Sequence, residues 1–135
     1  MYQVIMTPTL VPIIFLDFVK DVENFYRTID IFLLTSLWEG FGYVMVEAMA
    51  KKKPVIAFDI KSSAEVVDDG TCGYLVPRGD VEAMADRVLR LAGNRKLREE
   101  FGRRGLQKVE NQFTINNTIE EVRDFLTVKN GVTGL

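Results

Sequence analysis

The sequence contains no histidine and a single cysteine, Cys72. Without histidine, the chain cannot form a histidine-dependent catalytic triad, a histidine general base or a zinc site with imidazole ligands. One cysteine cannot form an intrachain disulfide, and a lone cysteine fits a reducing compartment. The sequence therefore predicts a cytoplasmic protein whose chemistry depends on neither histidine nor disulfides.

An excess of charge of one sign is also missing. The 17 lysines and arginines nearly balance 19 acids, for a net charge of −2, so we expect no nucleic-acid partner. The apolar stretch 4–18 is interrupted by prolines and is shorter than the roughly 20 residues that a membrane span needs. It also lacks the basic flank of a signal peptide, and we interpret it as a buried strand.

The size and composition are those of one globular domain. The chain has 135 residues, of which 47% are apolar and 27% charged. We expect a single domain over residues 1–128 and a frayed tail over residues 129–135.

Apolar runs of strand length alternate with helical patterns along the chain. Strands are expected at residues 11–16, 30–35, 54–58 and 73–76, and helices at 21–28, 42–52, 62–69, 81–92, 95–112 and 115–127. Uniformly apolar strands separated by helices are typical of a parallel sheet covered on both faces. The predicted fold class is α/β, with a parallel Rossmann-like sheet and helices on both faces.

Several details of these helices can be predicted. Asp21 and Asp80 are candidate N-caps, and Ser62 with Ser63 would open the helix 62–69. In the helix after Asp80, an apolar stripe follows helical spacing: Val81, Met84, Ala85, Val88, Leu89 and Ala92.

The segment after the second expected strand carries the clearest functional signal, because ligands of such sheets bind at the carboxyl ends of the strands. Gly40 and Gly42 permit a sharp turn and close approach of a ligand. The N–H groups around Gly42, Tyr43 and Val44 would point out of a helix N-terminus, which favours the negative charge of a diphosphate. The glycine pair alone is weak evidence, since Met45 replaces the third glycine of a dinucleotide fingerprint.

Two glutamates flank this segment. Glu47 is the sole charged residue from Tyr43 to Ala50, and a carboxylate buried in so apolar a helix needs a partner. A ribose diol would supply two hydroxyl donors, whereas a surface pair with Lys51 is the alternative. Glu39, in the preceding loop, could meet sugar hydroxyls or simply favour the helix N-terminus.

The spacing E-x7-E, from Glu39 to Glu47 within SLWEGFGYVMVEAMA, resembles the signature of GT-B-fold retaining glycosyltransferases. This group, glycosyl transferases group 1 or family 4, includes sucrose synthase, glycogen synthase and mannosyltransferases. The similarity covers roughly residues 11–127 and continues through KPVIA at Lys53, AEVVDDG at Ala64 and GYLVP at Gly73. It implies the C-terminal, donor-nucleotide-binding half of such an enzyme.

The resemblance also implies roles for individual residues. Glu39 would be the catalytic residue that orients the donor sugar, and Glu47 would bind the ribose. The amide cradle for the diphosphate or sugar would be formed by Gly40, Phe41, Gly42, Tyr43 and Val44. The implied reaction moves a sugar, with retention, from a UDP-, GDP- or ADP-linked donor to a glycan or lipid-linked acceptor. Members of the family need no metal, so no metal or other cofactor is expected.

Two features of the family find no counterpart in this sequence. The N-terminal acceptor domain is absent, and so are the arginine and lysine that clamp the diphosphate, since neither Lys20 nor Arg27 sits in a matching position. In place of the family's glycine-rich loop, this chain has IKSSA at residues 60–64, where Lys61 and the serines either contact phosphate or base or form a surface turn.

Because the acceptor domain and the diphosphate clamp are missing, the alternative function is a non-catalytic nucleotide-sugar-binding module or a truncated, inactive fragment. A sugar-nucleotide epimerase of the same architecture would need histidines.

Some residues favour a structural interpretation. The mixed run 94–104 is read as a solvated helix face, with weak contact to an anionic membrane as the alternative. The side chains of Trp38 and Phe41 are expected in core or lid packing, and that of Tyr43 in the core.

Overall fold

The computed structural model describes residues 3–6 and 12–114. In chain order its elements are β1 (Gln3–Met6), β2 (Pro12–Phe15), α1 (Val22–Thr28), β3 (Phe32–Leu34), α2 (Tyr43–Ala50), β4 (Val55–Phe58), α3 (Lys61–Val66), β5 (Gly73–Val76), α4 (Val81–Ala92) and α5 (Arg95–Gln112). The helix predicted over 115–127 and the tail 129–135 lie outside the described residues.

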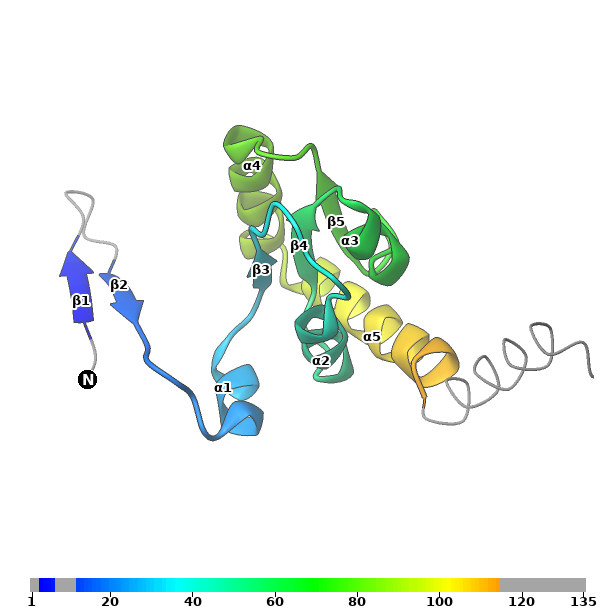
Figure 1. The fold of residues 1–135 in the computed structure, drawn as a ribbon, viewed down its shortest axis with the longest axis horizontal. Coiled ribbons are helices and arrows are strands. Elements are labelled where there is room, and N and C mark those ends of the chain that lie inside the picture. Colours follow the sequence, from blue (N-terminus) through cyan, green and yellow to red (C-terminus); the bar gives the residue numbers. More distant parts are fainter. Residues whose placement is uncertain (1–2, 7–11, 115–135) are drawn as a thin grey trace, which may run out of the picture.

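Three of the strands form a parallel sheet in the order β3-β4-β5. Phe32 lies opposite Val55 in the β3–β4 pair, and Val55 lies opposite Gly73 in the β4–β5 pair. Helices cover this sheet on both sides, so the predicted α/β class is confirmed (Figure 1).

The first predicted strand exists but does not join that sheet. β2 pairs antiparallel with β1, with Gln3 opposite Phe15, and the hairpin stands apart from the three-stranded sheet (Figure 1). The side chains of Ile13, Ile14 and Phe15 are exposed, so the prediction of a buried strand was wrong. A two-stranded ribbon buries its side chains only when another element packs on it. In the described part of the chain no second layer covers this hairpin, so these side chains stay exposed.

The central strand β4 is covered on both faces. Successive side chains of a strand point to opposite faces, and all four of β4 are buried. Val55 and Ala57 pack in one cluster with Met45, Ala48 and Met49 of α2. On the other face Ile56 and Phe58 pack with Met84 and Leu91 of α4 and with Phe101 of α5. Helix α5 therefore closes both layers.

Close approach of α5 to the end of α2 depends on glycine. A Cβ atom added at Gly102 would collide with the backbone carbonyl oxygen of Lys52, and one at Gly105 would lie 3.4 Å from Met49. Lys52 itself has a φ angle of 57°, in the left-handed region that few non-glycine residues adopt. The tight turn after α2 and the glycine face of α5 thus fit each other.

Both aspartate N-caps are confirmed. A side-chain oxygen of Asp21 accepts from the N–H of Asn24 at 2.9 Å, and one of Asp80 accepts from the N–H of Ala83 at 2.9 Å. The serine cap is wrong: α3 begins at Lys61, after Ile60, and has no side-chain cap. Ser62 and Ser63 are instead buried within the helix.

The apolar stripe of α4 differs from the prediction in phase. Met84 and Leu91 are buried and Val88 is half-buried, whereas Val81 and Leu89 are exposed. Apolar residues occupy more than one face of this helix, so spacing alone leaves its rotation open. Contacts with β4 and α5 decide which face turns inward.

We predict that Gly102→Ala lowers the free energy of unfolding by about 1–3 kcal/mol, because the new methyl group must displace the Lys52 backbone. Urea denaturation monitored by circular dichroism would measure the change.

Gly93→Ala is the matched control. Gly93 has a φ of −77°, and its added Cβ would meet only ordinary contact at 3.4 Å. It should leave stability unchanged or raise it by up to about 1 kcal/mol. Equal stability of the two variants would contradict the packing described for α5.

Candidate functional site

The loop from Thr35 to Gly42 joins the carboxyl end of β3 to the N-terminus of α2. Open parallel sheets bind ligands at this edge. Helix α2 is held in place by Met45, Ala48 and Met49, which have no exposed surface. The direction of its N-terminus is therefore fixed by the core.

Most N–H groups of the predicted amide cradle are free to donate a hydrogen bond to a ligand. In the described part of the chain, the N–H groups of Gly40, Phe41, Gly42 and Val44 have no backbone acceptor. The N–H of Tyr43 differs, because it donates to the Phe41 carbonyl at 2.8 Å. Tyr43 is thus the one predicted member whose amide is already engaged.

Glu39 is half-buried and tied to its own loop. One oxygen of its carboxylate accepts from the Ser36 hydroxyl at 2.8 Å. This hydrogen bond spans the start of the loop and holds the carboxylate at the edge of the sheet.

Glu39 also lines a pocket of about 380 Å³, here termed the Glu39 pocket. Its wall comes from residues 37–40 after β3, residues 60–62 at the start of α3, Glu65 of α3 and Arg78 after β5. Trp38 in this wall is 82% exposed, so it is not a core residue, and of the two packing roles expected for it only lid packing stays a prediction. The loops after all three parallel strands meet at this pocket.

Ser62 of the Glu39 pocket has an unusual environment. Its residue surface is 5% exposed, and among the described residues its hydroxyl oxygen has no hydrogen-bond partner. Burying a hydroxyl unpaired costs about 1–3 kcal/mol. The serines of the 60–64 loop do not form the surface turn that was one of the two predictions for them.

Glu47 lies on the outer face of α2. Its side chain is exposed, so the expectation of a buried carboxylate was wrong. The alternative pair with Lys51 is not formed either, because the Lys51 ammonium pairs with Glu23. The core takes the face with Met45, Ala48 and Met49, which turns position 47 outward.

The sequence did not predict the contact between Tyr26 of α1 and Glu47. The Tyr26 hydroxyl donates to a carboxylate oxygen of Glu47 and to the Val44 carbonyl, both at 3.3 Å. Burial raises the pKa of Tyr26 to about 12, and the charge and hydrogen bond of Glu47 add to this effect. Tyr26 therefore positions the Glu47 carboxylate against the first turn of α2. No short motif marks this residue, because the contact joins two helices 21 residues apart.

The aromatic residues of the loop pack outside the pocket. The ring of Phe41 lies 4.7 Å from that of Tyr43 and 6.0 Å from that of Phe113, measured between centroids. Phe41 is half-buried against the core, as expected, whereas Tyr43 is 69% exposed and is not a core residue.

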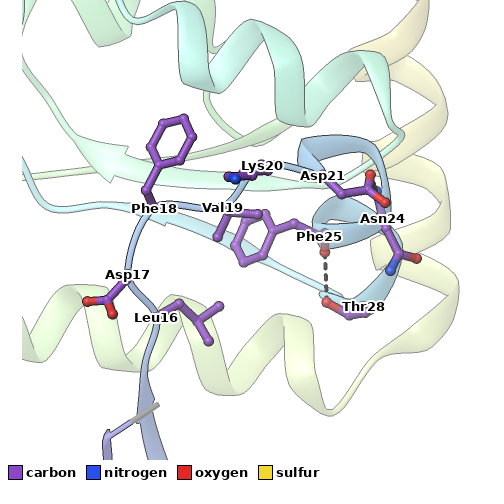
Figure 2. A pocket seen from close by; sticks show the side chains of 9 residues that line it. All are labelled: Leu16, Asp17, Phe18, Val19, Lys20, Asp21, Asn24, Phe25 and Thr28. Carbon is purple, nitrogen blue, oxygen red and sulfur yellow. Dashed lines mark hydrogen bonds between the residues drawn. The ribbon is translucent and has the colours of Figure 1, made fainter. Parts of the chain in front are cut away.

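A larger hollow, about 500 Å³, lies between the segment after β2 and helix α1. Figure 2 shows its walls, which run from Leu16 to Asp21 and then along α1 to Thr28. Lys20 lines it, but neither Glu39 nor Glu47 does. Arg27 is engaged by Glu23 at 3.9 Å. The two glutamates thus identify the Glu39 edge, and not this larger hollow beside α1, as the candidate site.

The basic run of α5 is largely satisfied internally. Arg95 pairs with Glu99 at 2.8 Å, Arg104 pairs with Glu100 at 2.5 Å, and Arg98 donates to the carbonyls of Leu91 and Ala92 that end α4. These contacts favour the solvated helix face over a membrane contact. Among the described residues, no helix combines the length and apolar character needed to cross a bilayer.

Residues 10–108 match the sequence model of the family described as glycosyl transferases group 1. The chain belongs to this family. It is 33% identical over 110 residues to the capsular polysaccharide biosynthesis glycosyltransferase CapM of Staphylococcus aureus, covering 82% of this chain and 29% of CapM.

Solved structures agree with this assignment. S. aureus TarM in complex with fondaparinux, alpha-GlcNAc-glycerol and UDP aligns with a TM-score of 0.76 and 30% identity, over 79% of this chain and 22% of TarM. The C-terminal domain of the group 1 protein LpcC from Francisella tularensis aligns with a TM-score of 0.68 and 33% identity, over 74% of this chain and 53% of that domain. The chain therefore has the fold of the C-terminal part of a GT-B glycosyltransferase and spans less than a third of CapM and of TarM.

We predict that Tyr26→Phe lowers the free energy of unfolding at neutral pH by about 1 kcal/mol through loss of the hydroxyl contacts. The pKa of Tyr26 rises from its usual 10.0 to about 12 on folding. Between these values the folded chain keeps a proton that the unfolded chain releases, so the stability advantage of Tyr26 falls as pH rises.

Urea denaturation of the wild type and Tyr26→Phe at several pH values would test this prediction. The difference between them should shrink from pH 10 to pH 12. A difference that is constant over this range would show that Tyr26 does not titrate as described.

Proposed function

We propose that this chain is the donor-binding part of a retaining hexosyltransferase. The reaction moves a sugar from a UDP-, GDP- or ADP-linked donor to a glycan or lipid-linked acceptor. One observation carries the proposal: Glu39 and Glu47 stand on either side of a glycine turn whose amides are free, at the carboxyl edge of a parallel sheet.

Each part of this edge suits one part of a nucleotide sugar. The exposed carboxylate of Glu47, held by Tyr26, can accept hydrogen bonds from both hydroxyls of a ribose. The amides of Gly40, Phe41, Gly42 and Val44 can donate to the diphosphate at the N-terminus of α2. Glu39, at the mouth of its pocket, can orient the sugar.

The solved relative TarM supports a nucleotide donor. It was crystallised with UDP and with alpha-GlcNAc-glycerol, and it shares 30% identity with this chain. Our proposal extends the binding of a nucleotide from that protein to this chain, as the nucleotide part of a sugar donor.

Catalysis in this proposal rests on positioning the sugar and stabilising the leaving diphosphate. We propose that it needs no metal or other cofactor, in line with a sequence that has no histidine. The acceptor is bound by protein beyond these 135 residues. The buried thiol of Cys72, whose pKa is raised by burial, suits a cytoplasmic setting.

A non-catalytic nucleotide-sugar-binding module is the second candidate. It is favoured because neither Lys20 nor Arg27, the cations of the N-terminal segment, is placed at the candidate site. Arg27 pairs with Glu23, and Lys20 lines the hollow beside α1. Neither lines the Glu39 pocket, and the two cations that do, Lys61 and Arg78, are matched in number by Glu39 and Glu65.

We predict that the chain binds one of UDP, GDP or ADP and that Glu47→Ala weakens this binding at least about tenfold, through loss of the hydrogen bonds of the ribose to a carboxylate. Isothermal titration calorimetry with the three nucleotides would measure it.

Glu110→Ala is the control, because it removes another exposed glutamate, on α5 and outside the Glu39 pocket. It should bind as the wild type does. Failure of the folded chain to bind any of the three nucleotides, or equal binding by both variants, would contradict the proposed donor site.

A further inference from the structure

Another pocket lies at the edge of the sheet opposite to the Glu39 pocket. Its volume is about 330 Å³, within the range of small-molecule sites. Asp30 precedes β3 and residues 52–54 precede β4, so this pocket lies at the amino ends of two parallel strands. The start of α5 completes its wall with Arg95, Arg98 and Glu99. It is termed here the Lys52 pocket.

The Lys52 pocket is positively charged, in a chain whose net charge is −2. Its four cations exceed its two acids by two: Lys52, Lys53, Arg95 and Arg98 against Asp30 and Glu99. Arg95 and Glu99 pair with each other at 2.8 Å, and Arg98 donates to the carbonyls that end α4. Among the described residues, the ammonium groups of Lys52 and Lys53 have neither an ion pair nor a hydrogen bond. These two lysines are therefore the cations left to bind a ligand.

The backbone of Lys52 supports a functional role for its side chain. The N–H of Lys52 donates to the Met49 carbonyl and that of Lys53 to the Ala48 carbonyl, both at 2.9 Å, which are the paired bonds of a Schellman motif. This motif usually has glycine at its left-handed position, where Lys52 stands with a φ of 57°. A lysine is less stable there than glycine, because its Cβ crowds the backbone carbonyl. Strain of this kind is concentrated at functional sites.

A phosphomonoester matches this set of groups. It carries a charge of about −1.5 to −2 at neutral pH, close to the excess charge of the pocket, and its oxygens accept hydrogen bonds. The flexible four-carbon stems of Lys52 and Lys53 let their ammonium groups reach a phosphate in the pocket. The carboxylate of Asp30 would repel a second phosphate and would accept hydrogen bonds from hydroxyl groups. The pocket therefore suits one phosphate group on a molecule that carries hydroxyls.

We propose that the Lys52 pocket binds the phosphate group of a phosphomonoester through Lys52 and Lys53. The site follows the C-terminus of α2, whereas the amides proposed to bind a donor lie at its N-terminus. Both ligands can therefore be bound at once, and this site does not depend on the proposed function. A free sugar phosphate and the headgroup of phosphatidic acid present the same group.

Nuclear magnetic resonance titration of the full ¹⁵N-labelled chain in a low-salt chloride buffer tests the proposal. The probes are inorganic phosphate and glucose 6-phosphate, with glucose as the uncharged control. Sedimentation with phosphatidylcholine vesicles, with and without phosphatidic acid, tests the lipid source. Each measurement is made on the wild type, Lys52→Gly, Lys53→Gln and Lys96→Gln. Lys96→Gln is the matched control, because it removes an exposed lysine of α5 that does not line the pocket.

Both phosphates should shift the amide signals of residues 52–54 and 95–98, and glucose should not. Lys52→Gly and Lys53→Gln should each raise the dissociation constant about tenfold, and Lys96→Gln should leave it within about twofold. Binding of glucose 6-phosphate assigns a free ligand. Binding only to vesicles with phosphatidic acid, lost in the same two variants, assigns a lipid headgroup.

Thermal unfolding separates loss of binding from loss of folding. Glycine suits the left-handed position, so the Tm of Lys52→Gly should equal or exceed that of the wild type. Lys53→Gln leaves that position unchanged and tests the site independently.

Three results would overturn the phosphate site. They are absence of binding to both phosphates and to the vesicles, amide shifts at residues 39–44 in place of 52–54, and an equal loss in Lys96→Gln. None of them decides nucleotide binding, which is tested separately by Glu47→Ala.

Discussion

The burial of helix α2 is the constraint on which the site depends. Met45, Ala48 and Met49 are fully enclosed, and α5 packs against the same helix. Because α2 cannot rotate without exposing this face, its N-terminus stays directed at the edge of the sheet and Glu47 stays outward. Gly42 lies against the end of the Met45 side chain, whose terminal methyl group a Cβ atom at position 42 would displace. A core contact thus determines the orientation of Glu47, the residue proposed to bind the ribose.

The two glutamates lie in different surroundings because a turn separates them. Glu39 lies where the loops after β3, β4 and β5 meet, and Glu47 lies on the outer face of α2 beside α1. An elongated ligand such as a nucleotide sugar can contact both only if its phosphates cross the turn between them, where the free amides are. In the proposed function, the spacing of the two acids along the chain therefore places one acid at each end of the ligand. Ser36 and Tyr26 each fix one of the two carboxylates.

The sequence predicted the α/β class and the aspartate caps, because these depend on local chemistry, whereas the segment from Glu39 to Glu47 stays a prediction of the site. The sequence did not predict the partner of β2, since an apolar run indicates a strand without identifying its neighbours. The rotation of α4 and the exposure of Glu47 were also set by packing with distant segments. The role of Tyr26 could not have been assigned from sequence, because its contact with Glu47 spans 21 positions. Tertiary contacts supplied what local patterns leave open.

The most direct test of the account is a crystal structure of this chain with the nucleotide that it binds. The account predicts both ribose hydroxyls within about 3 Å of the Glu47 carboxylate and the phosphates against the amides from Gly40 to Val44. A nucleotide bound in the hollow beside α1, or on another face with Glu47 in solvent, would contradict it.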